Sequence, residues 1–292
     1  MMYSMPHVLH RFLIKQVCSL VLREQSRRCI GVVVVGPGLM NEVISRDPWL
    51  KKVYSIVQSD IEINVLWDMA NVMAVKRLRY NDHGPIHALI TGAAATHIFK
   101  ALVSRRIEST LVRDGVVDRV EHATLVPMLG GLLHDIGNSI HRDLHEKLGS
   151  LLAKPIVERI LERLIDDYVT RIRIRQEIMH SIHCTAYDVE CLTVEAGCVK
   201  VGDGLDMAEG RARIPYKLGG VSIHSVSALS ISRVEVVEGD TIPVRINVYM
   251  NEKAGIFQVD EILTPKIKST PLKNYIEVYA IIGDQLLKTY KP

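Results

Sequence analysis

The stretch Gly130-Gly131-Leu132-Leu133-His134-Asp135-Ile136-Gly137 predicts the end of an apolar helix that carries a histidine and an aspartate side by side. A buried carboxylate at such a place needs a charged or hydrogen-bonded partner, and a divalent cation would be one. Adjacent residues diverge by about 100° around a helix, so both side chains can reach one ion only where the helix ends. Other helices must then bring the remaining ligands.

The periodicity on both sides of this stretch is helical from about Asn41 to Leu218. A run of small residues, Gly92-Ala93-Ala94-Ala95, would allow two helices to pack closely. Asn81-Asp82 can cap a helix whose first turn tolerates Pro85. The expected helices run through Val43–Ile56, Ile63–Val75, the segment after Asp82, Val117–Asp135, Leu144–Tyr168, Thr170–Ile182 and Leu192–Glu209.

Beyond Gly219-Gly220 the pattern changes to alternating and β-branched residues. Ser227–Val237 and Ile242–Met250 predict a hairpin, Ala254–Ile267 a short helix interrupted by Pro265, and Tyr275–Ile282 a further strand. We therefore predict an α+β fold with an all-α domain at residues 40–218 and a small α+β domain at residues 219–292. Residues 1–39 are predicted as a poorly defined basic segment.

That first segment carries five Lys or Arg residues against a single acid, Glu24. Such a start is typical of a transit or membrane-surface segment, or of an upstream extension that does not fold. We favour the extension, because Gly36-Pro37-Gly38 breaks the chain before the helical pattern begins. The apolar run Ile30–Val35 is too short to span a membrane, and no membrane association is expected.

The composition excludes several classes of protein. A net charge of +3 over 292 residues is too mild to indicate nucleic-acid binding. The five cysteines include no C-x-x-C pair, which favours free thiols and a cytoplasmic location. Cys184, Cys191 and Cys198 recur every seven residues, and we interpret them as a buried stripe rather than a zinc site.

Histidines gather in the helical part. Nine of the twelve lie there, at positions 83, 87, 97, 122, 134, 141, 145, 180 and 183. A single one, such as His97 or His122, is most simply a core or surface residue. As a group, however, several stand beside acids and so resemble metal ligands.

His87, His134-Asp135 and Asp203 together resemble the H…HD…D signature of the HD superfamily of metal-dependent phosphohydrolases. The resemblance extends over roughly Leu66 to Tyr216. Three blocks, Asn81–Ala88, Leu132–Gly137 and Val201–Arg211, are similar to an archaeal-type branch that also carries a C-terminal α+β domain.

The resemblance implies a ligand set. His87, His134, Asp135 and Asp203 would hold a first ion, which would be Mn, Fe, Ni, Co, Mg or Zn. Asp135 would bridge to a second ion if one binds, and His145 suits the first additional ligand position. Whether the site is mononuclear or dinuclear stays open at this point.

The last ligand of a second ion is the uncertain one. By one alignment it falls on Thr185, which would depart from the family pattern and leave a single-ion or weakened site. His180 and His183, three residues apart on one helix, are the candidates to replace it.

Cations near Asp203 are candidates to bind phosphate. Arg211 and Lys200 lie on either side of it in the sequence, and a guanidinium binds phosphate oxygens bidentately. The same cations would also suit a helix C-terminus with no role in binding. Asp206 and Glu209 would be partners that orient a ligand histidine, or a solvated acidic face.

The function implied is hydrolysis of a phosphomonoester, phosphodiester or nucleotide by a metal-activated water, with His134, Asp135, Arg211 and Lys200 as catalytic residues. The alternative is a non-catalytic HD-fold regulatory protein that binds a nucleotide or ion and dimerises through its C-terminal domain. Residues of that domain such as Lys253 and Lys266 have no metal or nucleophile spacing. Its strand edges predict a homo-oligomer.

Overall fold

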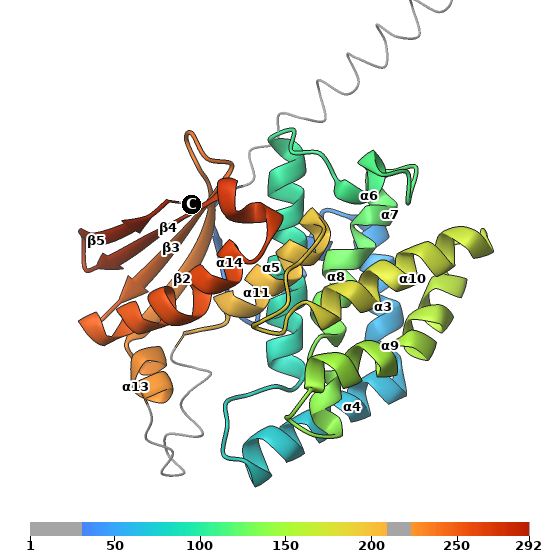
Figure 1. Ribbon diagram of the computed structural model, residues 1–292, viewed down its shortest axis with the longest axis horizontal. Helices are drawn as coiled ribbons and strands as arrows, with labels where there is room; N and C mark the ends of the chain where they lie inside the picture. The colour runs from blue at the N-terminus through green and yellow to red at the C-terminus, as the bar shows by residue number, and fades with distance from the viewer. Residues whose placement is uncertain (1–30, 209–222, 292) are drawn as a thin grey trace, which may run out of the picture. The chain divides into compact units, whose positions relative to one another are not determined.

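Helix α5 (Pro85–Ser104) runs through the middle of the helical part, with other helices packed around it (Figure 1). In the computed structural model, which describes residues 31–208 and 223–291, the described residues from Val32 onward form one compact unit. Among the described helices α5 alone is long and apolar enough to span a membrane, but 78% of its apolar window is buried inside the molecule. Helix α5 is therefore buried to the extent expected of a helix in the core of the molecule.

The small residues of α5 allow two other helices to approach its backbone. Helix α8 (Leu125–Leu133) approaches at Gly131, where an added Cβ would lie 2.6 Å from Gly92 Cα. Helix α11 (Val194–Leu205) approaches at Gly202, where a Cβ would lie 2.9 Å from Ala95 N. The close packing predicted for Gly92–Ala95 is therefore confirmed, and it brings together the helices that carry His87, His134 and Asp203.

The rest of the helical part surrounds this trio. Its elements are α2 (Leu39–Ser45), α3 (Pro48–Gln58), α4 (Ile61–Asn71), the π-helical turn η1 (Val72–Arg77), α6 (Thr110–Arg113), α7 (Val120–Ala123), the 3-10 turn η2 (Ile136–Ser139), α9 (His145–Glu162) and α10 (Tyr168–His183).

Two predicted helices are each interrupted. The helix expected through Val43–Ile56 is two helices, because Pro48 begins α3 and Asp47 caps it by accepting a hydrogen bond from Leu50 N at 3.2 Å. The helix expected over Val117–Asp135 likewise consists of α7 and α8.

The C-terminal part contains a five-stranded mixed sheet in the order β1-β2-β3-β4-β5. The predicted hairpin is confirmed as β2 (Ile231–Glu238) paired antiparallel with β3 (Val244–Met250). The remaining elements are α13 (Ile223–Leu229), η3 (Lys253–Gly255), η4 (Gln258–Leu263), α14 (Thr264–Lys268), η5 (Pro271–Asn274), β4 (Ile276–Ile282) and β5 (Gln285–Tyr290).

Two strands extend this sheet beyond the prediction. Strand β1 (Val33–Val34), from the segment predicted as poorly defined, pairs with β2, and β5 pairs with β4. Strand β4 runs parallel to β3, so the chain between them must cross over, and this crossover contains η4 and α14. Both elements contact α11.

The fold is therefore α+β, as predicted. The predicted boundary between residues 218 and 219 lies outside the described residues, and so do residues 1–30 of the predicted basic segment. Cys184, Cys191 and Cys198 are buried, as predicted, although Cys191 lies in the loop between α10 and α11 and not on a helix.

Replacing Gly131 by alanine should lower the free energy of unfolding by about 1–3 kcal/mol, because the new methyl group must push α8 away from α5. Urea denaturation followed by circular dichroism measures the change. Gly36→Ala is the control, since nothing lies within 4 Å of a Cβ at Gly36. Equal stability of the two variants would contradict the close contact.

Candidate metal centre

The His134–Asp135 pair lies where α8 ends. His134 is the C-cap residue of α8, and Asp135 follows it with φ −101° and ψ 0°. Both are buried, at 1% and 4% exposure. His134 Nδ1 lies 2.8 Å from Gly131 O, which can only accept, so Nδ1 donates and Nε2 is left to face the other ligands.

His87 is oriented in the same way from α5. It is fully buried, and its Nδ1 lies 2.7 Å from Asp206 Oδ2. A carboxylate on one imidazole nitrogen holds the ring in place and makes the other nitrogen a better ligand. The start of α5 is held by Asp82, whose Oδ2 accepts a hydrogen bond from His87 N at 3.1 Å.

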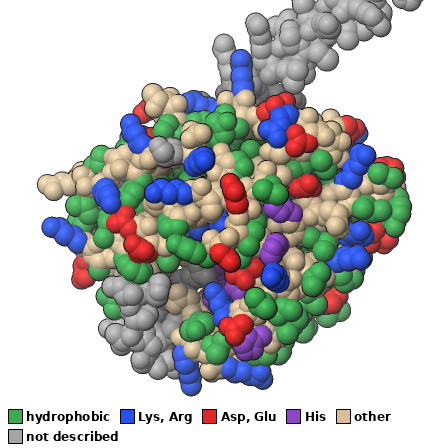
Figure 2. All heavy atoms as spheres, viewed as in Figure 1, with side chains coloured by type: hydrophobic (Ala, Val, Ile, Leu, Met, Phe, Trp, Pro, Cys, Tyr) green, Lys and Arg blue, Asp and Glu red, His purple; other side chains and the backbone are tan. Residues whose placement is uncertain are grey.

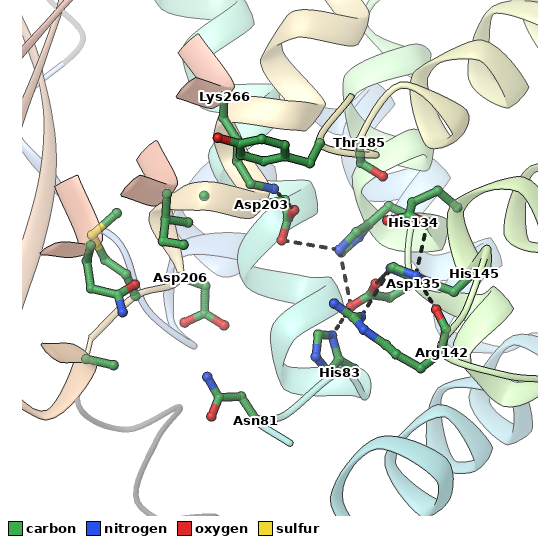
Figure 3. A pocket seen from close by; sticks show the side chains of 17 residues that line it. Asn81, His83, His134, Asp135, Arg142, His145, Thr185, Asp203, Asp206 and Lys266 are labelled. Atoms are coloured by element: carbon green, nitrogen blue, oxygen red, sulfur yellow. Dashed lines mark hydrogen bonds and ion pairs between the residues drawn. The ribbon is translucent and has the colours of Figure 1, made fainter. Parts of the chain in front are cut away.

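Four side-chain atoms converge on one point, as Figure 3 shows for three of the residues. His87 Nε2 lies 3.2 Å from His134 Nε2, 3.1 Å from Asp203 Oδ1 and 3.4 Å from Asp135 Oδ2. His134 Nε2 lies 3.3 Å from Asp135 Oδ2 and 3.6 Å from Asp203 Oδ1. Ligands about 2.1 Å from a shared ion are about 3.0–3.4 Å apart. The spacing therefore fits one divalent cation.

His83 is a fifth member of this cluster. It precedes α5, and its Nδ1 lies 2.7 Å from Asp135 Oδ2. Its backbone N–H donates to Asn71 Oδ1 at 2.9 Å, which anchors the loop before α5 to the end of α4. His83, His87 and Asp135 form a second group whose ligand atoms all lie within 4.8 Å of one another. The buried cluster thus offers two groups of three ligands that share His87, and it can hold a metal ion.

The buried charged groups shift one another's pKa values. Burial lowers the pKa of His134, but the carboxylates of Asp135 and Asp203 raise it to about 10. Burial raises the pKa of Asp135, yet the imidazoles of His134 and His83 hold it well below its usual range. At neutral pH this cluster keeps both carboxylates charged and a proton on His134.

Lys266 adds a cation from the C-terminal part. Its ammonium, on α14, forms an ion pair with Asp203 Oδ2, while Asp203 Oδ1 faces His87. Burial raises the pKa of Asp203, but Lys266 and the hydrogen bonds to His134 and His87 keep it well below its usual range. No spacing in the sequence relates Lys266 to Asp203, and only the crossover between β3 and β4 brings the two together.

The other oxygen of Asp135 faces different partners. Asn138 Nδ2 donates to Asp135 Oδ1 at 3.0 Å, and His145 Nε2 lies 3.4 Å from the same oxygen. His145 begins α9 and is buried. The structure therefore brings His145 to the site, on the far side of Asp135 from His87 and His134.

Lys200 lies on the same helix as Asp203 but outside the site. Its side chain is fully buried, and its ammonium donates to Ala186 O at 2.9 Å and to Val189 O at 2.6 Å. A buried ammonium needs such acceptors, and here backbone carbonyls satisfy it. The prediction that Lys200 binds phosphate is thus not supported, whereas Arg211 and Glu209 lie outside the described residues.

His180 and His183 do not reach the site either. His180 Nε2 accepts a hydrogen bond from Leu192 N at 3.2 Å, and His183 Nδ1 is buried with no hydrogen-bond partner among the residues that the structure describes. Helix α10 ends at His183, and Thr185, two residues further on, lines the cavity. Of these three positions, Thr185 is therefore the one that faces the site.

A cavity of about 260 Å³ opens onto the cluster. Histidine and acidic side chains gather around a hollow on the face shown in Figure 2. The helical part and the C-terminal part both line the cavity, whose described walls include Asn81, His83, His134, Asp135, Arg142, His145, Glu146, Thr185, Tyr187, Asp203, Asp206, Met207, Gln258, Ile262 and Lys266.

The fold and the cluster define an α+β protein with a buried histidine–aspartate centre that can bind a metal ion. The chain is 42% identical over 230 residues to uncharacterized protein MJ1020 of Methanocaldococcus jannaschii, an overlap that covers 79% of this chain and 88% of the relative. The chain therefore belongs to the same family as that archaeal protein. No family model matches the chain, and no solved structure matches it.

Metal binding should release a proton from His134, because its pKa of about 10 leaves the ring protonated at neutral pH. The apparent affinity for a divalent cation should rise about tenfold per pH unit and level off near pH 10. Calorimetry in two buffers of different ionisation enthalpy should count about one proton released per ion at pH 7. An affinity that does not change between about pH 6 and pH 9 would contradict this.

Replacing Asp206 by asparagine should weaken metal binding about 10–100-fold, because His87 loses the carboxylate that orients it. The number of ions bound per chain should stay the same. Isothermal titration calorimetry measures both quantities. The matched control is Asp143→Asn, an exposed residue near His145 in the sequence, and the role of Asp206 is excluded if the two variants bind the ion equally well.

Proposed function

We propose that this protein is a metal-dependent phosphohydrolase of the HD type. The observation that carries the proposal is the convergence of His87, His134, Asp135 and Asp203 on one point at distances that suit a single cation. These four residues are also the ones that resemble the H…HD…D signature. The two imidazoles are oriented through their Nδ1 atoms, as ligand histidines commonly are.

A divalent cation in this centre would supply Lewis acidity and lower the pKa of a water molecule toward neutrality. The chain's own residues position and neutralise the reacting groups. Lys266 holds Asp203 through the oxygen that does not face His87. With the ion held by the other four residues, His83, at the cavity wall 2.7 Å from Asp135, is placed to exchange a proton with the reacting groups.

The cavity favours a small phosphorylated substrate. Its volume of about 260 Å³ is below the range of about 300–1,000 Å³ that is typical of sites for drug-sized ligands. Its described walls carry four carboxylates as well as Arg142 and Lys266, so an anionic group would be held by the guanidinium of Arg142 and by a cation bound to the carboxylates. We therefore propose a phosphomonoester, phosphodiester or nucleotide as the substrate, and a nucleic-acid polymer is not expected.

We also propose a cytoplasmic location and self-association. The described cysteines are all free and buried, which suits a reducing compartment. Edge strand β5 exposes Leu286 and Leu287, at 53% and 44%, and such an edge favours pairing with another copy of the chain.

Purified protein should hydrolyse at least one member of a panel of phosphomonoesters, phosphodiesters and mononucleotides when Mn, Fe, Co, Ni, Mg or Zn is supplied. His134→Ala and Asp203→Asn should each lower kcat at least about a hundredfold, because the ion contributes several kcal/mol to the reaction. His141→Ala, which removes an exposed histidine from the neighbouring loop, should retain activity.

The outcome also separates the two functions that the sequence allows. Turnover that needs the metal and His134 supports the hydrolase. An ion bound by the wild type, with no turnover of any substrate, would instead favour the non-catalytic regulatory protein that binds a nucleotide or ion. Turnover that is unaffected by His134→Ala would overturn the proposed site.

A further inference from the structure

The carboxylate of Asp135 has two chemically different sides. Its Oδ2 faces His83, His87 and His134, at 2.7, 3.4 and 3.3 Å. Its Oδ1 faces the amide of Asn138 and the ring of His145. A carboxylate that bridges two metal ions has this two-sided environment, so the Oδ1 side is where a second ion would bind.

Arg142 already supplies a cation on the Oδ1 side. Its Nη1 lies 3.2 Å from His145 Nε2 and donates to Asn138 Oδ1 at 3.2 Å. His145 Nδ1 lies 2.9 Å from the backbone oxygen of Arg142, which can only accept, so Nδ1 carries a proton. In the neutral ring, His145 Nε2 then accepts from the guanidinium. The ring nitrogen that would bind a second ion is therefore used by Arg142.

The other ligands for a second ion are not found among the residues that the structure describes. Thr185 lines the cavity where the family pattern would have a histidine, and its hydroxyl donates to Ile182 O at 2.8 Å. His180 and His183 lie outside the cavity walls. Glu146 also lines the cavity, but its Oε2 lies 3.1 Å from His145 Nδ1, the ring nitrogen that does not face Asp135. The Oδ1 side of Asp135 itself thus offers one imidazole nitrogen and one carboxylate oxygen, which are too few to hold a divalent cation beside a guanidinium.

Arg142 is also built to bind an anion. It lines the cavity, and its side-chain hydrogen bonds to Asn138 and His145 both use Nη1. Within the described parts of the chain, Nε and Nη2 have no partner, so they can donate two parallel hydrogen bonds to phosphate oxygens. Figure 3 shows the Arg142 side chain extending toward His145 and Asp135.

We propose that Arg142 takes the place of a second metal ion in this centre. One divalent ion binds on the Oδ2 side of Asp135, and the guanidinium on the Oδ1 side binds the phosphoryl group of the ligand. The phosphoryl part rests on the proposed function, whereas the single-ion part depends only on the residues around Asp135.

Metal content and phosphate binding test this directly. Wild-type protein saturated with Mn²⁺ should contain one ion per chain by elemental analysis, and it should bind inorganic phosphate in isothermal titration calorimetry. Arg142→Gln should keep the single ion and lower phosphate affinity about 10–100-fold, the effect expected for lost hydrogen bonds to a charged group. Arg142→Lys should fall between the two, because it keeps the charge and loses the planar pair of donors.

The matched control is Arg113→Gln, which changes an exposed arginine that pairs with Asp114. It should leave metal content and phosphate affinity unchanged. Circular dichroism verifies that each variant is folded. Two ions per wild-type chain would overturn the inference, and so would phosphate binding that is undetectable in the wild type or equally strong in Arg142→Gln.

These outcomes are independent of catalysis. One ion and Arg142-dependent phosphate binding, without hydrolysis of any phosphoester, would support the inference and refute the proposed function. Hydrolysis by a protein that binds two ions would do the reverse.

Discussion

Two carboxylates buried in the helical part, Asp135 and Asp203, set the requirements for the structure around them. A charge removed from water is stable only where other groups compensate it. Four imidazoles face Asp135, three at Oδ2 and that of His145 at Oδ1, and Lys266 pairs with Asp203. The cluster depends on this compensation, and a divalent cation would extend it.

The imidazoles can neutralise these carboxylates only if the helices that carry them approach closely. Helices α8 and α11 both contact the backbone of α5, at Gly131 and Gly202. Each contact lies one turn or less before a ligand residue on the same helix, so the contacts set the positions of His134 and Asp203 relative to His87. The small residues of the core and the polar residues of the site therefore depend on the same packing.

The C-terminal part also contributes to the site. Because β3 and β4 are parallel, the chain must cross over between them, and the crossover places η4 and α14 against α11. Gln258, Ile262 and Lys266 consequently line the cavity. The crossover between two strands, whose sequence carries no recognisable chemistry, thus completes the cavity wall.

The sequence alone determined the α+β class, the succession of helices and strands, and four residues that converge, His87, His134, Asp135 and Asp203. It could do so because hydrophobic periodicity and a motif spread over three helices are both written along the chain. Periodicity alone also led to wrong helix boundaries, because an apolar pattern can continue across a break such as the one at Pro48.

Only the tertiary structure decided which cations reach the site. Lys200 is close to Asp203 in the sequence, but its ammonium bonds to backbone carbonyls, whereas Lys266, 63 residues away, pairs with Asp203. Long side chains extend in directions that spacing along the chain does not specify, and their partners come from elements far apart in sequence. For the same reason the sequence predicted His145 only as a metal ligand and did not predict that Arg142 lies beside it.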